Sequence, residues 1–317
     1  MIRLFKIEAG VIRERDVDPA RLAQDLEAAD WIDAHDPNQE ERALLEGLMQ
    51  TDVPASTDVE EIEASARCFV DQAGIHVHAL FLAQSEGRHN TVSVACILQA
   101  DRLICVREGD PADFRLLRMR ARRGQVEARS PAELLVTLFE QKVENHADTL
   151  EDLHRQLEAV SHLVLEDEES ELDDAIGQLA KLEDSNGKIR LCLMDTQRDI
   201  SFLLRHLRTE TGQLETLREI MRDIETLMSH TTFLFDKINF LMDSTQGFIN
   251  IEQNQIIKIF SIAAVVFLPP TLVASIYGMN FTHMPELEWL LGYPWAIGLM
   301  IAAGIAPYAY FKRKGWL

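Results

Sequence analysis

The sequence predicts an α+β membrane protein, in which an N-terminal mixed α/β domain precedes a long stalk helix that continues into the first of two transmembrane helices. Three observations predict this class. Two long apolar runs lie near the C-terminus. The 65 residues that end with the first run have the pattern of one continuous helix. Residues 1 to about 125 alternate short strand and helix patterns. Apolar runs of this length are typical of membrane spans.

The mixed α/β domain is expected at residues 1–128 and in the cytosol, because the N-terminus has no long apolar segment of the kind found in secretory signals. Short apolar stretches predict strands at 4–7, 74–82, 91–98 and 103–107. Helical spacing of apolar residues predicts helices at 37–49 and 111–122.

Residues 129–256 are expected to form a cytosolic long-helix region and stalk. Ser130, Pro131 and Glu133 mark a helix start, with Ser as the N-cap, Pro at the first helical position and Glu three residues after the cap. That helix is expected to reach about residue 164, and a second helix follows from the acidic stretch 166–174 to about residue 207. No Pro occurs from residue 213 until Pro269, so a single helix over 213–277 would be about 98 Å long.

Residues 257–317 are expected to form the transmembrane domain, with spans at about 257–277 and 289–311, an external loop at 278–288 and a cytosolic basic tail at 312–317. The stretches 259–277 and 289–311 contain 19 and 23 residues without a charge. A pair of buried core helices is the alternative, but Trp and Tyr at the ends of both runs favour membrane interfaces. Pro269 and Pro270 interrupt the first span, either to bend it around a water-filled passage or as a packing kink.

Basic residues set the expected orientation of the spans. Lys258 precedes the first span, three basic residues follow the second at 312–314, and the connecting loop contains no Lys or Arg. Because basic residues stay on the cytosolic side, both termini are expected in the cytosol and the loop outside.

The charge of the chain disfavours nucleic acid as a partner. The sequence has 52 acidic and 31 basic residues, for a net charge of −21. Residues 257–317 hold four basic and two acidic residues, so residues 1–256 carry −23. Such a domain repels phosphates and attracts cations, although acidity can also serve solubility alone. The four Cys show no CxxC spacing, which predicts neither a zinc site nor a disulfide framework.

Small, polar and aliphatic residues recur on one face of the expected long helix. Residues 243, 254, 257, 261, 268, 271 and 275 follow one another at steps of 11, 3, 4, 7, 3 and 4. In a symmetric ring of helices, Asn254 would supply a ring of amide oxygens, which suit a hard cation that keeps its water shell. The equal alternative is an Asn that sets the register and oligomer number of a coiled coil.

The loop between the spans is the second candidate for cation binding. Gly278 permits a tight turn with exposed carbonyls, and the Asn280 oxygen could bind the waters of a hydrated cation. Glu286 and Glu288 would concentrate cations outside the membrane. No phosphate-binding loop, HExxH motif or nucleophile elbow occurs, so the chain is not expected to be an enzyme and transport would be passive.

Two groups of residues in this loop carry a family resemblance. The run 277–280 (YGMN), followed by 284–287 (MPEL), resembles the signature loop of the CorA family of magnesium channels. Segments 60–67, 116–122, 189–198, 247–260 and 267–275 and the terminal KRKGWL are similar to the enterobacterial type, so the resemblance covers the whole chain. A departure occurs at Thr282 and His283, where many relatives carry an acidic and then an aromatic residue, and His283 suggests the hypothesis of pH-sensitive uptake.

The resemblance implies a funnel-shaped homopentamer in a bacterial inner membrane that takes up hydrated Mg²⁺, and also Co²⁺ and Ni²⁺, under the membrane potential. It implies that Gly278, Met279 and Asn280 bind the hydrated ion at the pore mouth. The matching pore-lining positions are Asn254, Ile257, Phe260, Leu268 and Thr271. Asp243 matches a regulatory position at which cytosolic Mg²⁺ bridges subunits and closes the gate. The alternatives are a ZntB-like zinc transporter, which Met279 disfavours, and a cation-sensing membrane protein without transport.

Overall fold

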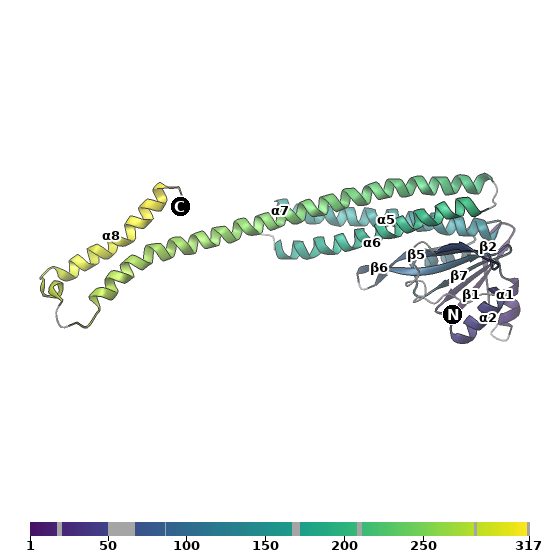
Figure 1. Cartoon of the computed structure of the whole chain (residues 1–317), viewed down its shortest axis with the longest axis horizontal. Coiled ribbons are helices and arrows are strands. Elements are labelled where there is room, and N and C mark those ends of the chain that lie inside the picture. Colours follow the sequence, from purple (N-terminus) through teal and green to yellow (C-terminus); the bar gives the residue numbers. More distant parts are fainter. Residues whose placement is uncertain are drawn as a thin grey trace. The chain divides into compact units, whose positions relative to one another are not determined.

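The computed structural model describes residues 1–17, 21–49, 67–85, 87–166, 172–207, 211–281 and 284–315, without the side chains of residues 166, 211, 212, 286 and 287 (Figure 1). This part of the chain forms two compact units, Met1–Met242 and Asp243–Leu317. The division into 1–128, 129–256 and 257–317 stays a prediction. By packing, the helices that follow residue 128 share a core with the sheet of the first unit.

The first unit is built on a sheet whose strand order is β2-β1-β3-β7-β6-β5-β4. Only β3 and β7 pair in parallel among the described strands. The strands are β1 (Ile2–Glu8), β2 (Val11–Arg15), β3 (Trp31–His35), β4 (Cys68–Val70), β5 (Ile75–Ser85), β6 (Arg88–Leu98) and β7 (Leu103–Arg107).

Strand prediction succeeded where the apolar signal is strong. The four predicted strands correspond to β1, β5, β6 and β7, although β6 begins three residues earlier than expected. Strands β2, β3 and β4 were not predicted. Arg and Glu dominate the second half of β2, and β3 carries the buried Asp33 at its centre, so neither has an uninterrupted apolar pattern.

Helices cover both faces of the sheet. Side chains alternate between the faces of a strand, and in β7 Leu103 and Cys105 join one buried cluster whereas Ile104 and Val106 join the other. Helices α1 (Leu22–Ala28) and α2 (Gln39–Met49) cover the smaller cluster. Helices α4 (Ala112–Arg122), α5 (Pro131–Glu166) and α6 (Leu172–His206) cover the larger one.

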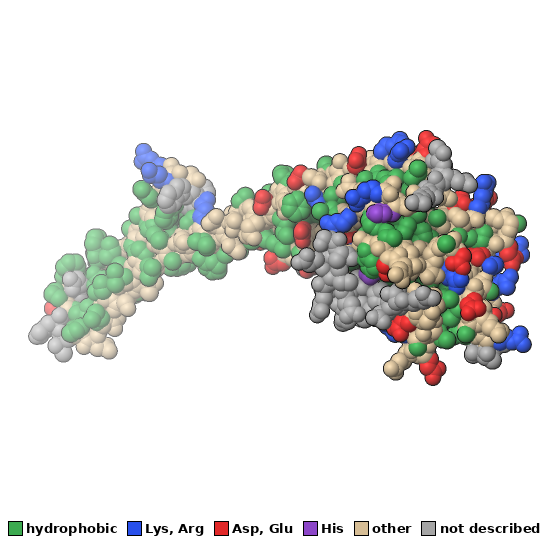
Figure 2. Space-filling model, turned by 45° about the vertical axis from the view of Figure 1, so that its right-hand side comes forward, with side chains coloured by type: hydrophobic (Ala, Val, Ile, Leu, Met, Phe, Trp, Pro, Cys, Tyr) green, Lys and Arg blue, Asp and Glu red, His purple; other side chains and the backbone are tan. Residues whose placement is uncertain are grey.

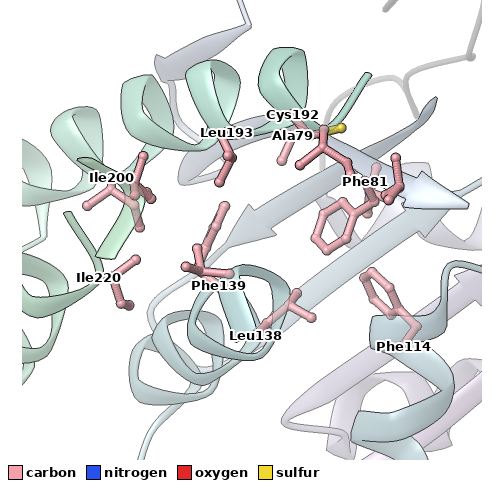
Figure 3. Packing of buried hydrophobic residues seen from close by; sticks show 14 of the residues in the cluster. Ala79, Phe81, Phe114, Leu138, Phe139, Cys192, Leu193, Ile200 and Ile220 are labelled. Atoms are coloured by element: carbon pink, nitrogen blue, oxygen red, sulfur yellow. The ribbon is translucent and has the colours of Figure 1, made fainter. Parts of the chain in front are cut away.

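The aromatic side chains of Phe81, Phe114 and Phe139 lie in the larger cluster (Figure 3), and a buried cation lies against two of them. The rings of Phe81 and Phe114 lie 5.3 Å apart, and the fully buried Lys142 Nζ lies 4.4 Å from the Phe81 centroid and 5.3 Å from that of Phe139. The ring faces carry negative charge, which offsets part of the cost of burying an ammonium group. One turn further along α5, burial lowers the pKa of His146 to about 3, and the nearby Lys142 charge acts in the same direction.

The start of α5 confirms the capping prediction. The Glu133 amide donates to Ser130 Oγ at 3.2 Å, and the Arg129 amide donates to the Glu133 carboxylate at 2.7 Å. The helix begins at Pro131, as expected from a residue that lacks an amide hydrogen.

The long helix is continuous. Helix α7 runs over Thr211–Tyr277 and passes through Pro269 and Pro270. A short 3₁₀ helix, η2 (Pro285–Glu288), precedes α8 (Gly292–Arg313), which begins three residues after the expected start of the second span and extends into the predicted tail.

Helices α7 and α8 are long and apolar enough to cross a membrane. In the most apolar 18-residue stretch of each helix, 0% of the residues of α7 and 6% of those of α8 are buried within the chain. Figure 2 shows hydrophobic side chains over these helices, with charged side chains gathered on the first unit. The alternative of two buried core helices is therefore wrong.

We predict that His146 makes the first unit less stable in mild acid. Its folded-state pKa lies below the value of 6.5 for an unfolded chain, so its stabilising contribution is present above pH 6.5 and is lost as the pH falls. Between pH 6.5 and 5 the loss is on the order of 2 kcal/mol. Unfolding of the detergent-solubilised chain by urea at several pH values measures it.

His146→Leu should remove this part of the pH dependence, whereas His206→Leu, at an exposed position on α6, should leave it in place. Equal pH profiles for the wild type and His146→Leu would contradict the prediction.

Candidate functional site

The candidate site is a stripe of side chains along α7. The proposed pore residues all lie in this one helix, and each is exposed in the single chain. Ile257, Phe260 and Leu268 expose 61%, 70% and 65% of their surface. For large apolar side chains on a folded chain, such exposure indicates a surface that lipid or another polypeptide covers.

Helix geometry orders these positions around the axis. At about 100° per residue, residues 243, 254, 257 and 268 fall within a sector of about 60°. Phe260 lies about 100° from Asp243, at the margin of the stripe, and Thr271 lies about 80° away. The stripe is therefore well defined for Asp243, Asn254, Ile257 and Leu268 and less so for the other two.

Space at the end of α7 favours a glycine. The Gly278 amide donates to the Ala274 carbonyl at 2.9 Å, which ends the helix. A Cβ at residue 278 would lie 3.1 Å from that same oxygen, closer than side chains normally approach backbone. A Cβ here would require the neighbouring carbonyl to shift by a few tenths of an ångström, so space rather than a left-handed backbone favours glycine at residue 278. Met279 and Asn280 follow immediately and are both exposed.

A contact between α7 and α8 lies at the proline pair. Pro270 has no amide hydrogen, so the Val266 carbonyl loses its usual donor within the helix. A Cβ on Gly304 of α8 would lie 3.4 Å from Pro270 Cγ and 3.7 Å from that carbonyl oxygen. A small residue at this position thus lets α8 approach the backbone of α7 where a helical hydrogen bond is missing. Thr271 donates its hydroxyl to the Phe267 carbonyl at 2.7 Å, as often occurs in membrane helices.

The loop residues are described in part. Glu288 is exposed in η2, and the side chain of Glu286 lies outside the described part of the chain, as do Thr282 and His283. Among the described residues, no group of three or more His, Cys, Asp or Glu could hold a metal ion. Asp243 is exposed on α7.

The sequence analysis missed an acidic groove between α5 and α7. Its cavity of about 280 Å³ is lined by Glu140, Glu144, Glu219 and Asp223 together with apolar side chains. Burial raises the pKa of Glu140, and the negative charges of the other three act in the same direction. The pairs 140/144 and 219/223 stand four residues apart on their helices, a spacing that could have indicated the groove.

The fold and the exposed stripe define a membrane protein with a large N-terminal unit and two membrane-spanning helices. The family described as CorA-like Mg²⁺ transporter protein matches residues 27–313. The magnesium transport protein CorA of Escherichia coli strain K12 is 48% identical over 319 residues and covers 100% of both chains. This chain therefore belongs to the CorA-like Mg²⁺ transporter family, which confirms the resemblance and the prediction that it is not an enzyme.

Solved structures agree on the fold. The complete structure of the CorA magnesium transporter from Methanocaldococcus jannaschii has a TM-score of 0.75 at 19% identity, covering 100% of this chain and 99% of that one. The cytoplasmic domain of ZntB from Vibrio parahaemolyticus RIMD 2210633 has a TM-score of 0.59 at 13% identity, covering 78% of this chain and 97% of that domain. At these identities the comparisons show the shared fold alone.

We predict that a bulky side chain at residue 304 weakens packing of α8 on α7. Gly304→Leu places its side chain against Pro270 and the Val266 carbonyl, at a cost of about 1–3 kcal/mol. The apparent melting temperature of the purified protein in detergent should fall accordingly. Gly298→Leu is the matched control on the same helix, because a Cβ there meets no atom of the chain within 4 Å. Equal losses from both substitutions would contradict the assigned contact.

Proposed function

We propose that this chain takes up hydrated Mg²⁺ through a pore formed by α7 helices of a homopentamer. The observation that carries the proposal is the exposed stripe of α7, which ends at Gly278, Met279 and Asn280 in a member of this transporter family. One α7 helix cannot enclose a pore, but symmetry-related copies of α7 arranged in a ring can enclose one along their common axis. Co²⁺ and Ni²⁺ are expected to pass as well.

The chemistry of the stripe suits a hydrated ion. Mg²⁺ releases its waters reluctantly, so an ion that enters with its shell is recognised through those waters. The Asn280 amide oxygen and the backbone carbonyls near Gly278 accept hydrogen bonds from such waters at the outer end. Asn254 supplies a second ring of oxygens, and Ile257, Phe260, Leu268 and Thr271 line the narrow part.

The membrane potential supplies the driving force. In the proposed orientation both termini lie in the cytosol of a bacterial cell, the loop faces outward across the inner membrane, and Glu286 and Glu288 raise the local cation concentration. Moving one charge through 100 mV is worth about 2.3 kcal/mol, so a divalent cation gains about 4.6 kcal/mol.

Regulation is proposed at the inner end of the pore. Asp243 lies where copies of α7 would meet, and Mg²⁺ bound there would bridge neighbouring subunits and favour the closed state. Without Mg²⁺, repulsion among the acidic segments 1–256 of the subunits, each with a charge of −23, would loosen the ring.

Replacing Asn280 tests the mouth. Asn280→Ala removes hydrogen bonds to the waters of the ion, which are worth about 1.5–3 kcal/mol each. At subsaturating Mg²⁺, uptake by liposomes that contain this variant should therefore be about 10- to 100-fold lower than with the wild type. Uptake by the wild type should rise with an inside-negative potential. Undiminished uptake in Asn280→Ala would contradict the assignment, and Zn²⁺ uptake that requires a proton gradient would contradict passive Mg²⁺ transport.

Asn254→Ala separates the two interpretations of the stripe Asn. A pore amide predicts several-fold slower Mg²⁺ uptake with unchanged oligomer mass, because only the ring of oxygens is lost. A residue that sets register predicts an altered oligomer mass. Gln255→Ala is the control, because residue 255 lies about 100° further around α7 and outside the stripe. Mass can be measured by light scattering in detergent.

A further inference from the structure

Helix α4 carries a concentration of arginine that ion transport does not explain. Five arginines lie within the nine residues 115–123, in a chain whose net charge is −21. Basic residues near a helix C-terminus interact favourably with the helix dipole, and this accounts for Arg120, Arg122 and Arg123 in the last turn and just beyond it. It does not account for Arg115 and Arg118, nor for Arg3 of β1, which lies beside them.

These side chains surround a hollow on the first unit. It has a volume of about 270 Å³, and its lining contains no acidic side chain. The lining residues are Arg3, Arg115, Arg118, Met119, Arg122 and Arg123. A second hollow shares Arg122 and Arg123 and adds Arg13, together with the acidic Glu14 and Asp16.

Two carboxylates hold the inner arginines in place. Arg118 donates to Asp33 at 2.9 Å and to Asp110 at 3.0 Å. The buried Arg107 donates to the same two carboxylates, at 2.9 and 3.1 Å to Asp33 and 2.9 Å to Asp110. Partial burial would raise the pKa of Asp110, but the Arg118 hydrogen bond and the charges of nearby arginines outweigh it and lower that pKa. The inner wall is thus rigid before any ligand binds.

The arginines outnumber their acidic partners. The carboxylates of Asp33 and Asp110 form ion pairs with four guanidinium groups. Arg107 and Arg118 pair with both carboxylates. Arg115 lies 3.7 Å from Asp110, and Arg3 lies 3.8 Å from Asp33. These six groups leave a charge of +2. Glu14 neutralises Arg122. Arg123 has no ion-pair partner within the part of the chain that the structure describes, which brings the local excess to +3.

One donor in the hollow lacks an acceptor. Arg3 Nη1 is buried and makes no hydrogen bond in the described chain, because its nearest carboxylate, that of Asp33, lies 3.8 Å away. Buried donors without partners are rare and costly, so a ligand oxygen that reached this atom would offset that cost. The negative charge elsewhere on the protein opposes anion binding weakly, because at physiological salt charges beyond about 8 Å are largely screened.

We propose that this hollow binds a soluble phosphate chain, the class that includes pyrophosphate, tripolyphosphate and the phosphates of nucleotides. Planar guanidinium groups bind phosphate oxygens in pairs, and a local charge of +3 matches a di- or triphosphate better than a single phosphate. The volume is at the small end for ligand sites, so the phosphate chain fits and a nucleoside would lie outside it.

Calorimetric titration of the full chain with tripolyphosphate tests the site. The protein is held in neutral detergent without Mg²⁺, which would chelate the ligand. The double variant Arg115→Ala/Arg123→Ala should bind at least tenfold more weakly than the wild type. Arg88→Ala/Arg120→Ala removes the same charge from exposed positions outside the hollow and should bind as the wild type does. Unchanged circular dichroism melting establishes that each variant is folded.

Three results would overturn the proposal. The first is an absence of saturable binding by the wild type. The second is an equal loss in both double variants, which would indicate general charge attraction. The third is saturation by phosphatidylglycerol vesicles but not by tripolyphosphate, which would assign the arginines to a lipid headgroup.

Discussion

The requirement that α7 remain one unbroken helix governs the rest of the structure. Lipid offers no hydrogen-bond partners, so a spanning backbone must satisfy its own polar groups. Helix α7 does so over 67 residues, and where Pro270 removes a donor the backbone of α8 approaches at Gly304. Because the helix is continuous, its stripe keeps one angular register from Asp243 to Leu268. A break would disconnect the proposed regulatory position from the proposed pore.

The distribution of charge links the acidic part of the chain, the acidic groove and the arginine hollow. A chain of −21 that concentrates acidic residues before its spans is suited to attract and respond to cations. The acidic groove on α5 and α7 is a local example in the first unit, since burial and the negative charges of its neighbours raise the pKa of Glu140. The arginine hollow has the opposite sign, and its positive charge results from two carboxylates shared among four guanidinium groups.

Sequence patterns predicted the helical parts well because those signals are long. The uncharged runs, the N-cap at Ser130 and the absence of Pro from 213 to 268 place α5, α7 and α8 within a few residues. The sheet was harder, since β3 buries Asp33 among arginines distant in sequence and no local pattern reveals that pairing. At the site, the sequence indicated Gly278, whereas its close approach to the Ala274 carbonyl depends on how the helix ends and could not be predicted from the sequence. The spacing of the acidic pairs could have indicated the groove, but the way in which tertiary contacts close the groove and the hollow could not be derived from sequence alone.

The central claim is that the stripe of α7 faces an axis shared by identical copies. An experimental structure of the assembled protein in lipid nanodiscs measures this most directly. The account predicts five copies whose Asn254, Ile257 and Leu268 side chains face the common axis, with Gln255 turned away from it. An assembly in which those three side chains face lipid, or in which α8 lines the axis, would contradict it.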